Sequence, residues 1–180
     1  TDKISNPQSK TLTPENWLGM LYYRIITKKE GSRTSYILLA WQGCSSLLTN
    51  KIIDVALFNT EGTPTFGKNV FSHLRPMFRG SPKRLIFHYS ASASMSLDYN
   101  PQKDMIIFDH LEPTASGLSG QYEYYAPSLI QDDGLVFKNG RWDYVNNVDA
   151  RNPSSQMDNL YHPEKDGDVS HHKKAIYTPH

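Results

Sequence analysis

The sequence predicts an all-β fold in which antiparallel meanders and hairpins form a sandwich or a barrel-like sheet, followed by an extended C-terminal arm. Short stretches that alternate apolar and polar residues recur at roughly the 8–12-residue spacing of sandwiches and barrels. No long stretch repeats its apolar residues at the helical period of about 3.6 residues. Asn139-Gly140 lies between two such stretches and favours the type I′ turn of a hairpin.

The composition limits the classes of protein that the chain can represent. At 180 residues, with 38% hydrophobic residues, it is long enough for one domain with a core. The net charge of +1 gives no general attraction for nucleic acid, so we expect no nucleic-acid partner. Cys44 is the single cysteine, which excludes an internal disulfide and a cysteine-based zinc site. No apolar run approaches the ~20 residues that span a bilayer, so we expect no transmembrane segment.

The chain divides into three parts by composition. Residues 1–12 are polar and are expected to form a flexible N-terminal segment. The β-domain is expected over residues 13–149. Residues 150–180 mix prolines and charges with scattered apolar residues, too few to build a core, and are expected to form the extended arm. The expected partner-docking residues of this arm are Leu160, Tyr161, Ile176 and Tyr177.

The first half of the β-domain predicts a hairpin and one further strand. Apolar residues on both faces of residues 17–26 favour a long interior strand, and a charged turn leads back into a strand at 35–41. Another strand is expected at 51–58. The apolar residues of segment 70–78 have mixed spacing and are interrupted by Pro76, which leaves a short strand and a helical turn as alternatives.

Three consecutive antiparallel strands are expected at the centre of the chain, around residues 85–90, 94–99 and 104–110. Asn100-Pro101 supplies a turn between the second and third strands, because proline presets φ and asparagine bonds the local backbone. The third strand is apolar on both faces up to Asp109. We therefore expect it to lie centrally in the sheet and to be covered on both sides.

The last part of the β-domain predicts a strand at 121–126, a loop at 127–133 and a closing hairpin. The strands of that hairpin are expected at 135–138 and 141–145, on either side of Asn139-Gly140.

Asp109 and His110 end the third central strand, at a position where sites are often built. Side chains of successive strand residues point to opposite faces, so Asp109 and His110 can share one metal or one proton relay only if the strand contains a bulge. A metal site would also need a third ligand, such as His88 or Asp98. We favour the alternative in which Asp109 caps loop amides and His110 is satisfied at a sheet edge. We expect no metal and no cofactor.

Aromatic residues cluster near the end of the β-domain. Rings beside Asp and Asn residues are typical of sugar or peptide platforms, and the alternative is that they form the core of the last sheet. The candidate ligand-binding residues are Asp109, His110, Tyr122, Tyr124, Tyr125 and Trp142, with Tyr144 nearby.

Catalytic signatures are missing from the sequence: there is no nucleophile elbow, P-loop or dinucleotide fingerprint. The paired carboxylates of a glycosidase would have to come from Asp98, Asp109, Glu112, Glu123 or Asp133. We therefore favour a protein that is not an enzyme.

The segments YILLAWQG, MIIFDHLEP, GQYEYYAP and DGLVFKNGRWDYV together resemble a family of functionally uncharacterised, β-rich cell-envelope proteins of gliding-type Gram-negative bacteria. The resemblance covers about residues 15–150. It implies a periplasmic or outer-membrane-associated location and other envelope proteins as partners, with no catalytic residue to carry over. The chain begins at Thr1 rather than methionine, which fits a cleaved secretion signal or a truncated chain.

We therefore expect a non-enzymatic extracytoplasmic structural or binding component that docks onto a larger envelope assembly through its sheet edge and C-terminal arm. The alternative is a glycan-binding module or a glycan-directed hydrolase that uses exposed aromatics and carboxylates.

Overall fold

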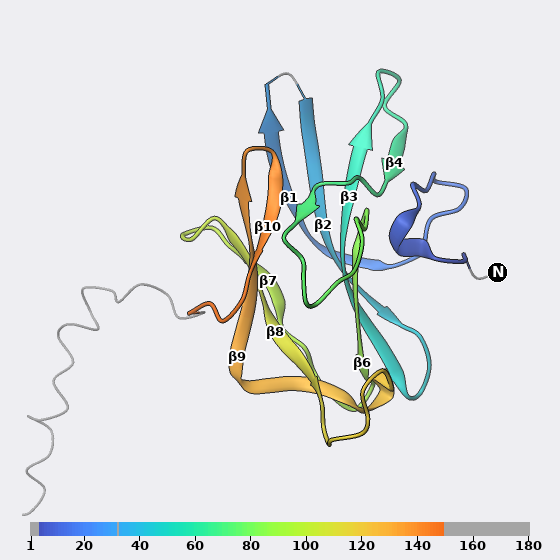
Figure 1. Ribbon diagram of the computed structural model, residues 1–180. Coiled ribbons are helices and arrows are strands. Elements are labelled where there is room, and N and C mark those ends of the chain that lie inside the picture. The colour runs from blue at the N-terminus through green and yellow to red at the C-terminus, as the bar shows by residue number, and fades with distance from the viewer. Residues whose placement is uncertain (1–3, 32, 150–180) are drawn as a thin grey trace, which may run out of the picture. The chain divides into compact units, whose positions relative to one another are not determined.

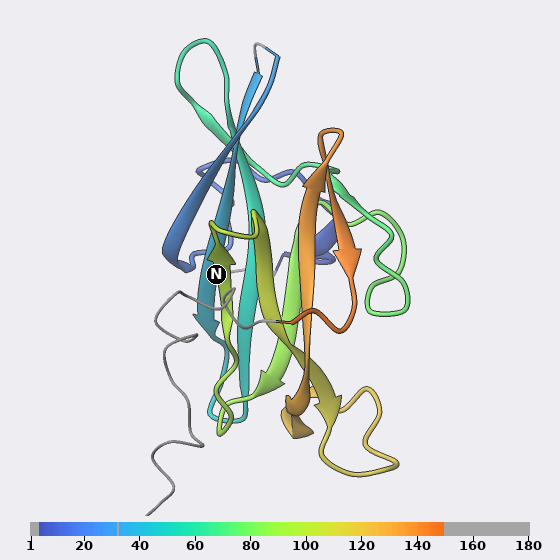
Figure 2. The ribbon, with the colours of Figure 1, turned by 90° about the vertical axis from the view of Figure 1, so that its left-hand side faces the viewer.

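The computed structural model describes residues 4–31 and 33–149 and consists of two antiparallel-rich sheets packed face to face (Figure 1). The sheets are not closed into a barrel, so the all-β prediction is confirmed and its sandwich form is the one adopted. Figure 2 shows the two layers from the side, with β1–β3 in one and β8–β10 in the other. In the described part of the chain, no helix has the length and apolar character needed to cross a membrane.

The first sheet has the order β1-β2-β3, and two short strands share the far edge of β3. β6 pairs with the first part of β3, and β4 pairs with its last residues, Ala56 to Phe58. All these pairings are antiparallel. The strands are β1 (Leu21–Glu30), β2 (Arg33–Gly43), β3 (Leu48–Phe58), β4 (Pro64–Phe66) and β6 (Leu85–Ser90).

The second sheet has the order β5-β10-β9-β8-β7, in which β5 pairs parallel to β10 and the other pairings are antiparallel. Segment 70–78, where a strand and a helical turn were alternatives, contributes the short strand β5. The strands are β5 (Phe71–Ser72), β7 (Leu97–Asn100), β8 (Met105–Pro113), β9 (Tyr125–Lys138) and β10 (Arg141–Val145).

Two predictions about this sheet are confirmed. Asn139 and Gly140 join β9 to β10 with φ of 48° and 76°, the positive values that a type I′ turn requires. β8 lies inside the sheet, between β7 and β9, as its apolar sequence predicts, but the expected cover on both faces is not found, because Met105 and Ile107 are only partly buried.

The prediction that strands 85–90 and 94–99 are neighbours is wrong. β6 pairs with β3 in the first sheet, whereas β7 pairs with β8 in the second. Residues 91–96 therefore carry the chain between the two layers. The alternation of apolar residues in β6 shows which face of the strand points into the core. That pattern would be the same in either sheet, so it does not identify the sheet that β6 joins.

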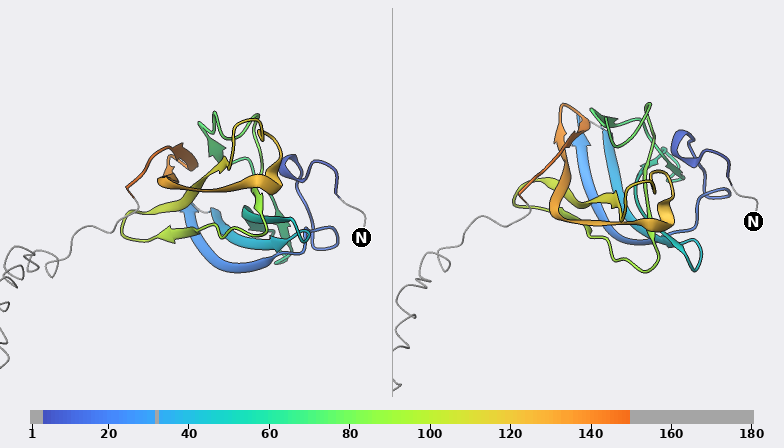
Figure 3. Two further views of the ribbon diagram at one scale, coloured as in Figure 1. Left: turned by 90° about the horizontal axis from the view of Figure 1, so that it is seen from below. Right: turned by 60° about the horizontal axis from the view of Figure 1, so that its bottom comes forward.

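The region between β8 and β10 also differs from its prediction. Residues 122–124 form a short 3-10 helix, η2 (Tyr122–Tyr124), where a strand was expected. β9 begins at Tyr125 and runs through residues 127–133, where a loop was expected. Figure 3 shows η2 and the start of β9 together at one end of the sandwich.

The core lies between the two sheets and is built from the inward residues of every long strand. Leu39, Ile53 and Leu85 are fully buried on the first sheet, and Ile106, Leu135 and Trp142 are fully buried on the second. Trp142 was a candidate ligand-binding residue, and its burial in the core corrects that assignment. Alternation along β10 turns its ring inward, where it packs on Phe137 with ring centroids 5.2 Å apart.

The N-terminal segment packs on the outer face of the first sheet. It includes a short 3-10 helix, η1 (Pro7–Ser9), and Leu12, which is buried and pairs with Phe66. Arg84 reaches out from the start of β6 and donates hydrogen bonds to the carbonyls of Pro7 and Lys10. Residues 4–12 therefore belong to the β-domain, and the expectation of a flexible segment does not hold for them.

The two open sides of the sandwich differ. On one side β1 and β7 are joined by polar contacts: the Arg24 guanidinium binds both carboxylate oxygens of Asp98 at 2.6 and 2.8 Å, and the Tyr23 hydroxyl donates to Leu97 O at 2.8 Å. On the other side β6 faces η2 and β9. A pocket lies on this second side.

Candidate functional site

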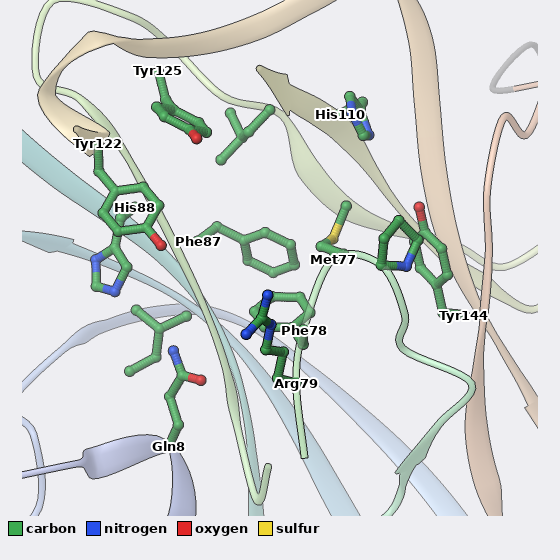
Figure 4. Close-up of a pocket in the computed structure, with 13 residues that line it drawn as sticks. Gln8, Met77, Phe78, Arg79, Phe87, His88, His110, Tyr122, Tyr125 and Tyr144 are labelled. Carbon is green, nitrogen blue, oxygen red and sulfur yellow. The ribbon is translucent and has the colours of Figure 1, made fainter. Parts of the chain in front are cut away.

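A pocket of about 470 Å³ lies beside β6, within the range of about 300–1,000 Å³ typical of ligand sites (Figure 4). We call it the histidine pocket, because His88 and His110 line it from the two different sheets. The described residues that line it are Gln8, Pro76, Met77, Phe78, Arg79, Ile86, Phe87, His88, His110, Leu111, Tyr122, Tyr125 and Tyr144.

His88 is held by a polar ladder that crosses the outer face of the first sheet. Its Nδ1 lies 2.6 Å from Asn50 Oδ1. The amide nitrogen of Asn50 donates to Cys44 Sγ at 2.8 Å and to Gln42 Oε1 at 3.3 Å, so Asn50 presents its oxygen to the ring and His88 Nδ1 is the donor. Burial lowers the pKa of His88. The imidazole is therefore neutral at pH 7, and its Nε2 is a hydrogen-bond acceptor.

Aromatic rings continue from His88 across the mouth of the pocket. The Tyr122 ring lies 5.2 Å from His88 and 5.2 Å from Tyr125, and all three rings are drawn in Figure 4. Tyr125 accepts a hydrogen bond from Gly120 N at 3.1 Å, which fixes its hydroxyl. Tyr122 is 45% exposed, so part of its ring is available to stack on a ligand.

His110 lies where the pairing of β8 with β9 is interrupted. Asp109 pairs with Asp132, but Leu111 pairs with Pro127, so four residues of β9 bulge opposite His110. This irregularity brings His110 Nδ1 to 2.6 Å from Asp133 Oδ2.

Asp133 is a fully buried carboxylate surrounded by donors. Gln131 Nε2 and Asn147 N donate to its Oδ1 at 2.9 and 3.1 Å, and the Tyr144 hydroxyl also bonds it. Burial acts to raise the pKa of Asp133, but these hydrogen bonds together with the one from His110 outweigh it and lower the pKa. The ionised carboxylate therefore accepts Nδ1–H of His110 and fixes the orientation of that ring.

The rest of the lining is mainly apolar, with Gln8 and Arg79 as its polar residues. Phe78 and Phe87 meet edge to face, with ring centroids 5.3 Å apart, and Met77 lies beside them (Figure 4). Arg79 follows this apolar group and is exposed. Among the described lining residues there is no Asp or Glu.

The described lining holds some, but not all, of the groups that hydrolytic sites use. The Asp133–His110 pair orients an imidazole as a general base requires. However, the described lining contains no Ser, Thr, Cys or Lys as a nucleophile, and no carboxylate pair for glycoside hydrolysis.

The structure brings together three of the six candidate ligand-binding residues, His110, Tyr122 and Tyr125, and the nearby Tyr144 lines the same pocket. Tyr124 is 47% exposed but lies outside the described lining. Asp109 also lies outside it, and its Oδ2 accepts a hydrogen bond from Ser96 N at 2.7 Å, which is the loop-capping alternative.

The sequence reasoning did not identify Asp133 as the partner of His110. The pair Asp132-Asp133 before Gly134 was a usable signal, but the assigned loop at 127–133 hid its pairing with β8. His88 was considered only as a possible third metal ligand beside His110, and Arg79 was missed, because neither residue follows a motif.

Two further expectations concern other parts of the chain. Within residues 4–31 and 33–149 there is no group of three or more His, Cys, Asp or Glu side chains placed to hold a metal ion. The docking residues Leu160, Tyr161, Ile176 and Tyr177 lie outside the described residues.

Comparison of the chain with models of protein families, with curated proteins and with solved structures found no match. The function is therefore argued from the geometry of the site.

Proposed function

We propose that the β-domain is a non-enzymatic binding module and that the histidine pocket is its ligand site. The observation that carries this proposal is the pocket itself, with two oriented imidazoles, a ring-lined mouth and an apolar floor. Such a combination supports binding because the apolar floor supplies affinity, while the fixed polar groups select and orient the ligand.

The proposal extends to the setting in which the module works. We place it in the periplasm or at the outer membrane, as a component that docks onto a larger assembly of envelope proteins. Support for this setting is the resemblance of segments such as MIIFDHLEP and GQYEYYAP to envelope proteins. A second contact through residues 150–180 remains a prediction that lies outside the described residues.

A glycan is the second candidate ligand, and Tyr122 is the observation that favours it. Its partly exposed ring lies beside the acceptor of His88, an arrangement that suits a sugar ring and its hydroxyls. The hydrolase form of this alternative has less support, since the described lining offers no carboxylate.

A fragment screen by NMR tests the proposal. Monosaccharide methyl glycosides and capped tripeptides are titrated into the isotopically labelled full chain, and amide shifts are mapped. We expect shifts to gather on β6, η2 and the start of β9. Tyr122→Ser should weaken them, whereas the control Phe58→Ser, which removes a ring that is 54% exposed on β3, should not. Shifts that gather elsewhere, or survive Tyr122→Ser unchanged, would contradict the proposal.

A further inference from the structure

The outer edge of β6 carries backbone groups that face the histidine pocket. Ala91 N donates to Leu47 O at 2.9 Å, in the same register that pairs Leu48 with Ser90. Since hydrogen-bonded and non-hydrogen-bonded pairs alternate in an antiparallel ladder, residues 85, 87 and 89 direct their backbone groups toward β3. Ile86 and His88 therefore direct their N–H and C=O groups away from β3. Both residues line the pocket.

Within the described residues, the outer edge of β6 is not paired with another strand, whereas the edge of the neighbouring β4 is paired. Along β4, Leu12 and Phe66 exchange both backbone hydrogen bonds, at 2.7 and 2.8 Å. Along β6, nothing in residues 4–31 and 33–149 bonds the outward N–H and C=O groups of Ile86 or His88. An open strand edge is a template for another strand.

The open edge is short and has defined ends. At one end Lys83 N donates to Gln8 O at 2.7 Å, so η1 adjoins the chain just before β6. At the other end Tyr122 of η2 lies over His88. At a rise of about 3.3 Å per residue, the stretch between them accommodates an added segment of about three residues.

The chain beside this edge is basic. Residues 62–97 contain no Asp or Glu and five basic residues, which are Lys68, Arg75, Arg79, Lys83 and Arg84. Arg84 is paired with Asp54, but Arg79 is exposed at the pocket. Arg79 is the one of these five residues in the described lining, and a negative group on a ligand would complement it.

We propose that the β6 edge and the histidine pocket together bind an extended, acidic peptide segment of a partner protein, which adds to the first sheet as a short strand. The backbone groups of Ile86 and His88 pair with the peptide backbone. One apolar or aromatic peptide side chain enters the pocket against Phe87 and Tyr122, and a neighbouring acidic side chain meets Arg79. This inference rests on the proposed function and names its ligand class.

A displayed library of random seven-residue peptides, selected on the purified full chain, supplies the probe. We expect the selected peptides to combine Asp or Glu with one large apolar residue. Arg79→Glu should weaken a resynthesised peptide about tenfold, a loss appropriate to one charge-assisted contact, and replacing the peptide's acid by lysine should restore binding to that variant. Lys29→Glu, the same charge change on exposed β1, is the control and should leave affinity unchanged.

An N-methyl scan of the selected peptide tests strand addition itself. In an added strand, every second residue directs its backbone N–H group toward β6. N-methylation should therefore abolish binding at these positions and be tolerated at the positions between them. Loss without this alternation, or affinity unaffected by Arg79→Glu, overturns the acidic-strand inference. If monosaccharides rather than peptides shift the pocket, the inference is wrong but the binding module stands. If neither shifts it, the proposed function fails as well.

Discussion

Among the described residues, each sheet contains one buried aspartate, Asp54 in the first and Asp133 in the second, and the two have different roles. Both have exposures of 1% or less, and each bonds a basic side chain: Arg84 Nε at 3.0 Å and His110 Nδ1 at 2.6 Å. Arg84 is itself fully buried, whereas the His110 side chain is 30% exposed. The Asp54–Arg84 pair is therefore shielded from solvent, and we call it the sealed pair. The Asp133–His110 pair borders the histidine pocket.

The two carboxylates also differ in how completely they are bonded. Burial raises the pKa of Asp54, and its bonds to Arg84 and Val55 N offset this only in part. Burial acts in the same direction on Asp133, but its larger set of donors lowers the pKa of that group. Whether a buried carboxylate is ionised therefore depends on the hydrogen-bond donors around it as well as on a nearby opposite charge.

The partners of these aspartates explain their roles. Arg84 Nη1 donates to the carbonyls of Pro7 and Lys10, so the sealed pair holds the N-terminal segment to the sheet. His110 uses one ring nitrogen on Asp133 and lines the pocket with the rest of its ring. A buried aspartate bonded to a basic side chain therefore stabilises the fold in the first sheet and positions a pocket-lining histidine in the second.

Breaking the sealed pair should have the largest effect on stability. Arg84→Met leaves the Asp54 carboxylate buried without its partner, and we expect a loss of about 3–5 kcal/mol in the free energy of unfolding. Urea denaturation measures this. The double variant Arg84→Met/Asp54→Leu should recover much of the loss, because no uncompensated charge remains. A loss below about 1 kcal/mol in the single variant would mean that the pair is not sealed.

Asp133→Asn should have a smaller effect, about 1.5–3 kcal/mol, because an amide keeps the shape but loses charge-assisted hydrogen bonds. It should also release His110, seen as a change in the ring resonances of that histidine by NMR. Asp132→Asn, one residue away, is the matched control. Equal losses in the two variants would contradict the assignment of Asp133 as the His110 partner.

The pH dependence of stability sharpens the same contrast. An unfolded aspartate has a pKa of about 3.9, and that of folded Asp133 is lower, so its ionised form stabilises the fold above about pH 4 and this contribution is lost as the pH falls further. The stability difference between wild type and Asp133→Asn should therefore shrink below about pH 4. Urea melts at a series of pH values measure it, and a difference that grows on acidification would reverse the sign assigned here.

Gly140→Val tests a feature outside both pairs. The residue holds φ at 76°, which a β-branched side chain resists, so we expect a loss of about 1 kcal/mol or more. Thermal unfolding reports it. An unchanged melting temperature would count against the turn geometry.

The smallest stability effect should come from the open site. Tyr122→Ser removes a ring that is 45% exposed, and we expect less than about 1 kcal/mol of destabilisation together with a clear loss of ligand binding. Calorimetric unfolding and the NMR titration measure the two effects on one sample. A large destabilisation without loss of binding would make Tyr122 a structural residue.

The sequence was informative wherever a local pattern decides the structure. Local sequence patterns predicted the first hairpin and the Asn139-Gly140 turn, because both are specified by neighbouring residues. The first strand was expected in the interior of its sheet, however, whereas β1 begins at Leu21 and forms the edge. Alternation could not assign β6 to a sheet, since an inward face of Leu85 and Phe87 suits either layer. The site was less predictable for the same reason. His88 and His110 come from different sheets, and the bulge that joins His110 to Asp133 depends on pairing rather than on composition.

Amide hydrogen exchange along β6 in the unliganded chain tests the central claim most directly, namely that this strand presents an open edge beside the histidine pocket. The amides of Phe87 and Tyr89 bond β3 and should exchange slowly, whereas those of Ile86 and His88 should exchange faster by a factor on the order of a hundred. This alternation, resolved residue by residue by NMR, is the result that the account predicts. Uniformly slow exchange from Leu85 to Ser90 would show that the edge is already covered and would contradict it.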